Sequence, residues 1–260
     1  MTTEVMPAPT QSVAQALQDL EKFGLALLSD QLTPSQLLLA RQATYAAVDE
    51  DGEKGRFQGF ALDYGDANIR VWNILNRHGV FRDLVQMPQV VELLTAVLGW
   101  PALLGNISAN ITQPGGTGGA LHADQLFMPT PWPVRAQGMN VAWCLDDFTQ
   151  ANGATQIVPF SHLRSANAHQ AAISEAMPVI APAGTMMILD SRLWHRTGEN
   201  TSQQSRAALF GWYTRPIYRT QENWFLSLDS AIVDTASDTL LTLLGYKSQG
   251  LGLVYGQSPR

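Results

Sequence analysis

The sequence predicts a mainly β protein: a double-stranded β-helix, or jelly roll, with flanking α-helices. Two observations predict this fold. Helical patterns fill the N-terminal third of the chain, and from about residue 101 short apolar or alternating runs follow one another, separated by Gly, Pro or Asn. Seven or eight short strands after a helical third are typical of two packed sheets with helices outside. The 260 residues contain no linker or repeat, so we expect a single domain over 1–260.

The first hundred residues are expected to hold three helices and two short strands. Apolar residues recur at helical spacing over 13–23, where Gly24 ends the helix, and 25–28 is a short strand. A second helix begins at Thr33, with Gln36 completing a capping box, and runs to about residue 49. Residues 69–74 alternate like a strand, and a helix opened by Pro88 follows. Residues 1–10 are expected to be disordered.

The later part of the chain is expected to form the jelly roll. The predicted strands cover 101–111, 120–128, 138–146, 154–158, 178–181, 184–194 and 206–214. One more amphipathic segment, 239–244, is expected to be helical.

Composition limits the classes of function. The net charge of -6 argues against nucleic acid and anionic membrane surfaces as main partners. The apolar fraction of 45% and charged fraction of 15% are typical of a globular protein. A single cysteine, Cys144, excludes an internal disulfide, and the N-terminus has no secretory pattern. We therefore expect a cytoplasmic protein that acts on a small molecule, with a homodimer left open.

The segment Leu121-His122-Ala123-Asp124 carries the first candidate ligands. On a β-strand, residues i and i+2 share a face, so His122 and Asp124 would project together. Taken alone, His-x-Asp is a common tripeptide. A partner appears far downstream, at His195. Two imidazoles and one carboxylate are the ligand set of non-haem iron(II) oxygenases.

Arg206 lies eleven residues after His195 and begins an alternating strand. Alternation places Ala208, Phe210 and Trp212 on the same face as Arg206. An arginine at the start of an apolar face calls for an anionic partner. Its guanidinium matches a carboxylate in bidentate fashion, so Arg206 is a candidate anion clamp. A structural salt bridge with an Asp or Glu is the alternative.

Together, His122-x-Asp124, the stretch Asn152-Gly153-Ala154-Thr155-Gln156-Ile157-Val158-Pro159-Phe160-Ser161-His162, His195 and Arg206 resemble the phytanoyl-CoA dioxygenase family. The resemblance extends from Thr33 to Tyr213. It implies an iron(II)- and 2-oxoglutarate-dependent oxygenase on a cupin-like jelly-roll core. His122, Asp124 and His195 would bind iron.

The resemblance also implies co-substrate contacts. Arg206 would pair with the distal carboxylate of 2-oxoglutarate, and dioxygen would be the second co-substrate. Thr155 and Thr197 match positions that hydrogen-bond 2-oxoglutarate, and Arg70 matches a second basic contact. Two positions depart from the family pattern: Gly119 replaces a common Gln, and Phe160 replaces a usual Gly.

The implied reaction is hydroxylation, or a related desaturation or cyclisation, at an unactivated C–H bond. In halogenating relatives a small residue replaces the carboxylate, so Asp124 favours oxygenation. Because no Lys/Arg cluster is apparent, we expect a small organic molecule of secondary metabolism, with apolar rings, before an acyl-CoA. An acyl-CoA hydroxylase, a redox-neutral cupin-like metal isomerase or hydrolase, and a non-catalytic binding module are the alternatives.

Several aromatic residues are candidates for the pocket. Trp143 and Trp212 lie on predicted strands, where an aromatic is more often part of the core. In relatives, five further aromatic positions lie on segments that fold over the pocket mouth, namely Phe57, Phe60, Trp72, Phe127 and Trp132.

Overall fold

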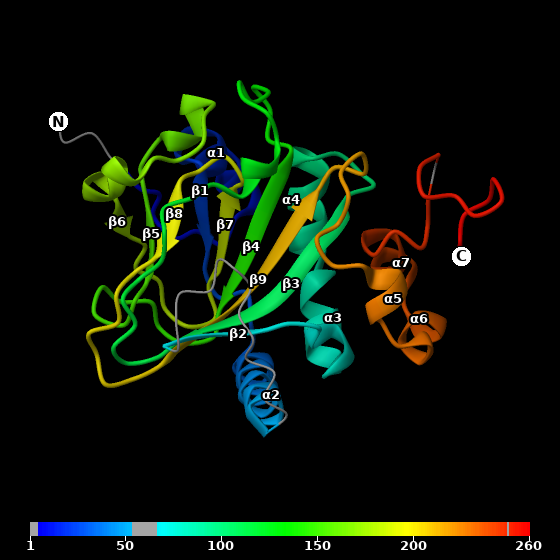
Figure 1. Ribbon diagram of the computed structural model, residues 1–260, viewed down its shortest axis with the longest axis horizontal. Helices are drawn as coiled ribbons and strands as arrows, with labels where there is room; N and C mark the ends of the chain where they lie inside the picture. Colours follow the sequence, from blue (N-terminus) through cyan, green and yellow to red (C-terminus); the bar gives the residue numbers. More distant parts are fainter. Residues whose placement is uncertain (1–4, 54–66, 249) are drawn as a thin grey trace.

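The computed structural model describes residues 5–53, 67–248 and 250–260. Its main sheet has six antiparallel strands (Figure 1). In spatial order these are β1 (Leu25–Leu28), β7 (Met186–Asp190), β4 (Gly138–Cys144), β9 (Arg206–Thr214), β3 (Leu103–Thr112) and β2 (Asn68–Val71). A second, smaller sheet is ordered β6 (Met177–Pro178), β5 (Thr155–Ile157) and β8 (His195–Thr197).

The two faces of the main sheet have different neighbours. Odd-numbered residues of β4 and β9, such as Val141 and Leu209, pack in one apolar cluster with the helices. Even-numbered residues, such as Ala142 and Ala208, pack in a second cluster with Ile157 of the small sheet. The strict alternation of a two-sided strand therefore places β5 and β8 over one face and the helices over the other.

The helices surround the sheets. They are α1 (Val13–Phe23), α2 (Pro34–Glu53), α3 (Gly79–Val85), α4 (Pro88–Val97), α5 (Trp224–Ser227), α6 (Ser230–Thr235) and α7 (Asp238–Leu243). Short 3-10 helices cover η1 (Ile74–Asn76), η2 (Asp124–Phe127), η3 (Ser161–Arg164) and η4 (Gln170–Glu175). Among the described residues, no helix is long and apolar enough to cross a bilayer. Figure 1 shows α5, α6 and α7 grouped at one end of the molecule, beside the C-terminus.

The predicted fold class, a jelly roll with flanking helices, is confirmed. Most predicted elements are present within a few residues of their expected bounds, and the helix at Pro34 extends four residues further, to Glu53. Gly24 ends α1 in the left-handed conformation, with φ 73°. The expected disorder over 1–10 is too broad: residues 1–4 lie outside the described part, whereas Thr10 already pairs with Leu28.

Two predicted strands are wrong in extent. Over 120–128, only His122 makes a strand-like bridge, and Asp124–Phe127 is a 3-10 turn. The apolar residues after Asp124 curl because Leu126 and Met128 donate backbone hydrogen bonds to Ala123 and Gln125. The predicted strand 184–194 ends at Asp190, whose side chain turns the chain by bonding Arg192. The chain then enters the small sheet as β8, which we did not predict. Helix α3 begins directly after His78, where we expect a helix start, whereas helices α5 and α6 were missed.

Candidate metal centre

His122 and His195 are brought together by the backbone. The N–H of each residue donates to the carbonyl of the other, at 3.0 and 2.8 Å, so the segment before Asp124 becomes a one-residue extension of the small sheet. The imidazole rings lie 4.4 Å apart between centroids. Residues 73 positions apart in the chain are thereby fixed side by side.

Both imidazoles are oriented by their own chain. Nδ1 of His122 lies 3.0 Å from the carbonyl oxygen of Ala120, and Nδ1 of His195 lies 3.0 Å from that of Leu193. A ring that donates Nδ1–H to a carbonyl leaves Nε2 as a lone-pair donor. This tautomer is the one that binds a metal ion through Nε2.

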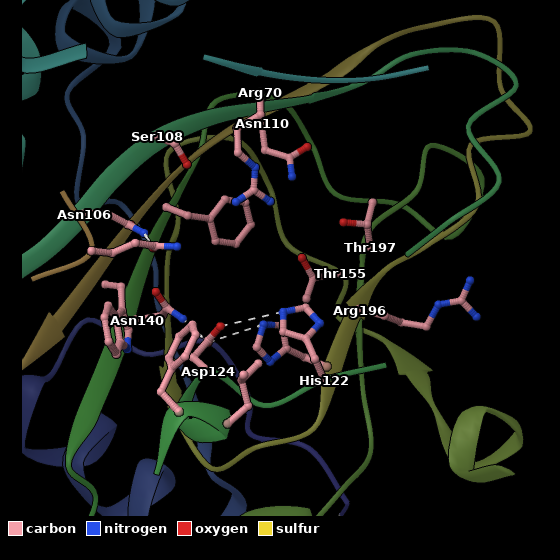
Figure 2. A pocket seen from close by; sticks show the side chains of 16 residues that line it. Arg70, Asn106, Ser108, Asn110, His122, Asp124, Asn140, Thr155, Arg196 and Thr197 are labelled. Atoms are coloured by element: carbon pink, nitrogen blue, oxygen red, sulfur yellow. Dashed lines mark hydrogen bonds and ion pairs between the residues drawn. The ribbon is translucent and has the colours of Figure 1, made fainter. Parts of the chain in front are cut away.

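Asp124 completes the cluster. Ala123 is extended, with φ -123° and ψ 141°, so Asp124 emerges on the same side as His122. Its carboxylate oxygens lie 3.7 Å from Nε2 of His122 and 3.5 Å from Nε2 of His195, as the dashed lines in Figure 2 indicate. Ligand atoms of all three side chains lie within 4.8 Å of one another. The sequence prediction that these three residues meet is therefore correct in geometry.

The electrostatics of the cluster suit a cation. Burial, and then the neighbouring His195, lower the pKa of His122 to about 4. At neutral pH this imidazole is therefore uncharged and able to coordinate. Two imidazoles with one carboxylate could hold a divalent metal ion of the iron or zinc type.

A cavity of about 90 Å³ opens beside the cluster. His122, Asp124 and His195 contribute to its wall, and a row of polar residues on β3, at 106, 108 and 110, faces them. Phe127, Phe210 and Trp212 add aromatic surface. The lining therefore combines amide and hydroxyl groups with aromatic rings, which makes it more polar than a pocket for purely apolar rings.

Three of the four predicted co-substrate residues line this cavity. Thr155 and Thr197 are paired across β5 and β8, and Figure 2 shows both on the same side of the cavity. Arg70 enters from β2, where its cross-strand neighbour is Asn110.

The fourth predicted residue, Arg206, does not line the cavity and is 1% exposed. It lies on the same face of β9 as Phe210 and Trp212, with the small Ala208 between. Nη2 donates to Thr112 Oγ1 at 2.9 Å and to the Gly153 carbonyl at 2.6 Å, and the guanidinium lies over the Phe148 ring.

Arg206 is charged but forms no ion pair among the described residues. Nε and Nη1 have no hydrogen-bond partner, and among the described residues no carboxylate lies within ion-pair distance. Burial lowers the pKa of Arg206 to about 10, so the side chain is still cationic at neutral pH. The alternative of a structural salt bridge is therefore wrong. A buried, half-satisfied guanidinium is costly and calls for an anion.

Several polar residues of the site were not predicted, among them Asn106, Ser108, Asn140, Arg196 and Gln221. Asn140 on β4 donates to the Asp124 carboxylate, and Asn106 on β3 donates to Gln221. For Asn106 and Asn140, the available sequence signal was a carboxamide side chain on a predicted strand. Among the aromatic candidates, Phe127 and Trp212 line the cavity, whereas Trp143 and Trp132 are core residues. Trp72 does not line it, and Phe57 and Phe60 lie outside the described residues.

The comparison with known proteins agrees with this geometry. The family described as phytanoyl-CoA dioxygenase (PhyH) matches residues 20–208. The chain belongs to the phytanoyl-CoA dioxygenase family. All seven residues predicted to bind iron or co-substrate lie within the match. For the domain that it covers, the match confirms the expected enzyme class, an iron(II)- and 2-oxoglutarate-dependent dioxygenase.

Individual members and solved structures resemble the chain over most of its length. Dioxygenase af480 of Aspergillus fumigatus is 36% identical over 193 residues, which cover 73% of this chain and 62% of that protein, less than two thirds of its length. The α-ketoglutarate-dependent carbocyclase SnoK from nogalamycin biosynthesis superposes with a TM-score of 0.63 and 19% identity, covering 89% of this chain and 94% of SnoK.

HygX from Streptomyces hygroscopicus, solved with nickel and 2-oxoglutarate bound, superposes with a TM-score of 0.64 and 13% identity. This likeness covers 79% of the chain and 88% of HygX. At these identities the structural neighbours establish the jelly-roll fold of this PhyH-family chain.

Proposed function

We propose that this protein is an oxygenase that uses iron(II), 2-oxoglutarate and dioxygen to oxidise an unactivated C–H bond of a small organic molecule. The observation that carries the proposal is the pairing of a His122–Asp124–His195 cluster with a buried guanidinium that forms no ion pair with any described residue. The outcome is hydroxylation, or a related desaturation or cyclisation. The products belong to biosynthesis, the setting in which SnoK acts.

His122, Asp124 and His195 hold the iron in this proposal. Their donor set fits because two imidazoles and one carboxylate on one side leave other coordination positions open. When bound, iron(II) and 2-oxoglutarate supply the activation of dioxygen. The chain itself contributes the orientation of the ligands, the binding of the co-substrate and the exclusion of water.

Arg206 binds the distal carboxylate of 2-oxoglutarate. Its Nε and Nη1 are the unsatisfied donors, and a carboxylate would accept a hydrogen bond from one of them and supply a countercharge. The Thr155 and Thr197 hydroxyls, which face the cavity from β5 and β8, hydrogen-bond the co-substrate along its length. Arg70 provides a second positive charge from β2.

The alternatives fit less well. A redox-neutral isomerase or hydrolase would have no use for an uncompensated guanidinium near its metal. An acyl-CoA carries several phosphate charges, yet Arg219 is the one basic side chain among the described residues of the apolar pocket that adjoins the cavity. The buried thiol of Cys144 suits a reducing compartment, so the cytoplasm remains our proposed location.

Anaerobic titration tests the proposal. Iron(II) followed by 2-oxoglutarate should produce the weak visible charge-transfer band of the chelate. Asp124→Ala should abolish both iron binding and the band, while the exposed control Asp30→Ala should retain them. Full oxygenase activity in Asp124→Ala, or a folded, iron-binding protein that forms no band, would overturn the assignment.

A further inference from the structure

Two carboxamides meet at the outer edge of the cavity, far from the proposed co-substrate clamp. Asn106 Nδ2 donates to Gln221 Oε1, although the two residues are 115 positions apart. Asn106 is buried on β3, whereas Gln221 is exposed on the loop that follows β9. Both line the cavity beside the metal centre, and Gln221 also lines the adjoining pocket.

A β-bulge aims Asn106 at this position. The register of β3 against β9 shifts between Leu104 and Asn106, at Gly105. Bulges beside active sites re-aim side chains. The bulge also anchors the loop, because Glu222 N–H donates to the Gly105 carbonyl at 2.9 Å and Trp224 Nε1 donates to the Leu104 carbonyl at 2.7 Å. These bonds between the bulge and the loop hold Asn106 and Gln221 next to each other.

The pair lies beyond the reach of the co-substrate. In the register of β3 with β9, Thr112 is opposite Arg206 and Asn106 is opposite Trp212. Six residues of strand separate the two ends, which is roughly 20 Å. Figure 2 shows Asn106 on the opposite side of the cavity from Thr155 and Thr197. A five-carbon dicarboxylate held by Arg206 cannot touch Asn106, so the amide pair serves another ligand.

The chemistry of the pair specifies what it binds. After the bond between them, one amide still offers an acceptor and the other a donor. This holds whichever way each amide is turned, since their mutual bond always uses one of each. The complementary ligand group both donates and accepts, as a hydroxyl or a carboxamide does. A carboxylate, which only accepts, fits less well.

The surroundings specify the rest of the ligand. The adjoining pocket, of about 360 Å³, shares Phe127, Trp212 and Gln221 with the cavity and adds Met128, Pro129 and Tyr218. Trp212 is a fixed platform: its indole N–H donates to Ser191 Oγ at 3.1 Å, and a Cβ at residue 105 would lie 2.4 Å from its ring. An apolar body would rest on this surface.

We propose that the substrate is an uncharged amphipathic molecule whose hydroxyl or carboxamide group is held by Asn106 and Gln221 and whose apolar body lies on Phe127 and Trp212. This inference rests on the proposed function, because it names the substrate class of that same site. The amide pair then fixes which carbon of the substrate faces the metal centre.

Binding of matched probes tests the inference without turnover. The protein loaded anaerobically with iron(II) and 2-oxoglutarate is titrated with 2-decalol, decalin-2-carboxamide and 2-methyldecalin, which share one apolar body. Dissociation constants come from the change in tryptophan fluorescence. We expect the alcohol and the carboxamide to bind about tenfold more tightly than the methyl compound, as one satisfied hydrogen bond allows.

Variants assign the difference to the pair. Gln221→Met, at an exposed position, should reduce the ratio to within about twofold and leave the affinity for 2-methyldecalin unchanged. Asn106→Leu should do the same, with its fold checked by circular dichroism. The exposed Gln203, on the loop before β9, provides the matched control, and Gln203→Met should keep the wild-type ratio.

The outcomes separate this inference from the proposed function. If the chelate band never forms in the wild type, both fail. If the band forms but the wild type binds the three probes equally, or binds none, the substrate class is wrong. Persistence of the tenfold ratio in both Gln221→Met and Asn106→Leu would likewise overturn the role of the pair.

Discussion

Asn140 donates its side-chain N–H to the carboxylate of Asp124. The donor lies on β4, between Leu189 of β7 and Trp212 of β9, and is 6% exposed. A carboxylate with one oxygen engaged by a fixed amide presents the other in a defined direction. Asn140 is therefore a positioning residue for the proposed metal ligand, held by the rigid centre of the main sheet.

Removal of this amide should weaken metal binding. In Asn140→Ala the Asp124 carboxylate is free to rotate, and we expect the affinity for iron(II) to fall by about 10- to 100-fold. Anaerobic iron titration measures the change. Asn76→Ala, which removes hydrogen bonds outside the site, should lower stability and leave iron affinity unchanged. An Asn140→Ala protein with wild-type iron affinity would show that Asp124 needs no support.

Replacement of Arg206 separates an anion clamp from a structural residue. Arg206→Met keeps the length of the side chain and removes a buried charge whose Nε and Nη1 are unsatisfied. We expect the melting temperature of the apoprotein to change little, because the lost bonds to Thr112 and Gly153 are offset by relief of desolvation. Affinity for 2-oxoglutarate should fall at least about 100-fold, the cost of losing a charged pair.

Iron binding provides the control for Arg206→Met. The His122–Asp124–His195 cluster does not contact Arg206, so the dissociation constant for iron(II) should stay within about twofold of the wild type. A variant that loses iron and 2-oxoglutarate together, or that fails to fold, would show that Arg206 supports the structure instead.

The His122–Asp124 half of the metal centre was predictable because it depends on local geometry, whereas its meeting with His195 depends on long-range backbone pairing. An extended Ala123 places His122 and Asp124 on one side whether or not a strand continues beyond them. The 3-10 turn after Asp124 was not predictable, since Leu126-Phe127-Met128 reads as a strand until Gln125 is seen to bond Ser191. The Asn106–Gln221 pair depends on a bulge and a loop 115 residues away, and no local pattern encodes it.

At Phe160 the family resemblance implies a glycine, and the backbone has a conformation that glycine favours. It has φ 59° and ψ 6°, the left-handed conformation that costs a residue with a side chain about 1–2 kcal/mol. The Phe160 ring compensates by packing against Phe23, with centroids 6.1 Å apart. Phe160 thus keeps a positive φ and gains an aromatic contact.

Two substitutions at Phe160 test this account. Both Phe160→Ala and Phe160→Gly lose the contact with Phe23, but only glycine is unstrained at positive φ. We expect the glycine variant to be more stable than the alanine variant by about 1 kcal/mol in urea unfolding. Ala43 in α2 provides the control: the Ala43→Gly variant should be less stable than the wild type, because glycine is the poorer helix former. If Phe160→Ala is as stable as Phe160→Gly, or more stable, the backbone at residue 160 is not strained.

Cys144 should make the protein less stable in alkali. Burial raises the pKa of its thiol to about 12, whereas an unfolded cysteine has a pKa of about 8.5. Above pH 8.5 the unfolded state loses a proton that the folded state keeps, so the free energy of unfolding falls as pH rises toward 12. Between pH 8 and 10 this linkage amounts to about 2 kcal/mol.

Urea unfolding of wild type and Cys144→Ala at both pH values measures this loss of stability, because alanine has no proton to lose. The wild type should lose about 2 kcal/mol more than the variant over this range. Equal losses would mean that the folded thiol ionises as readily as the unfolded one.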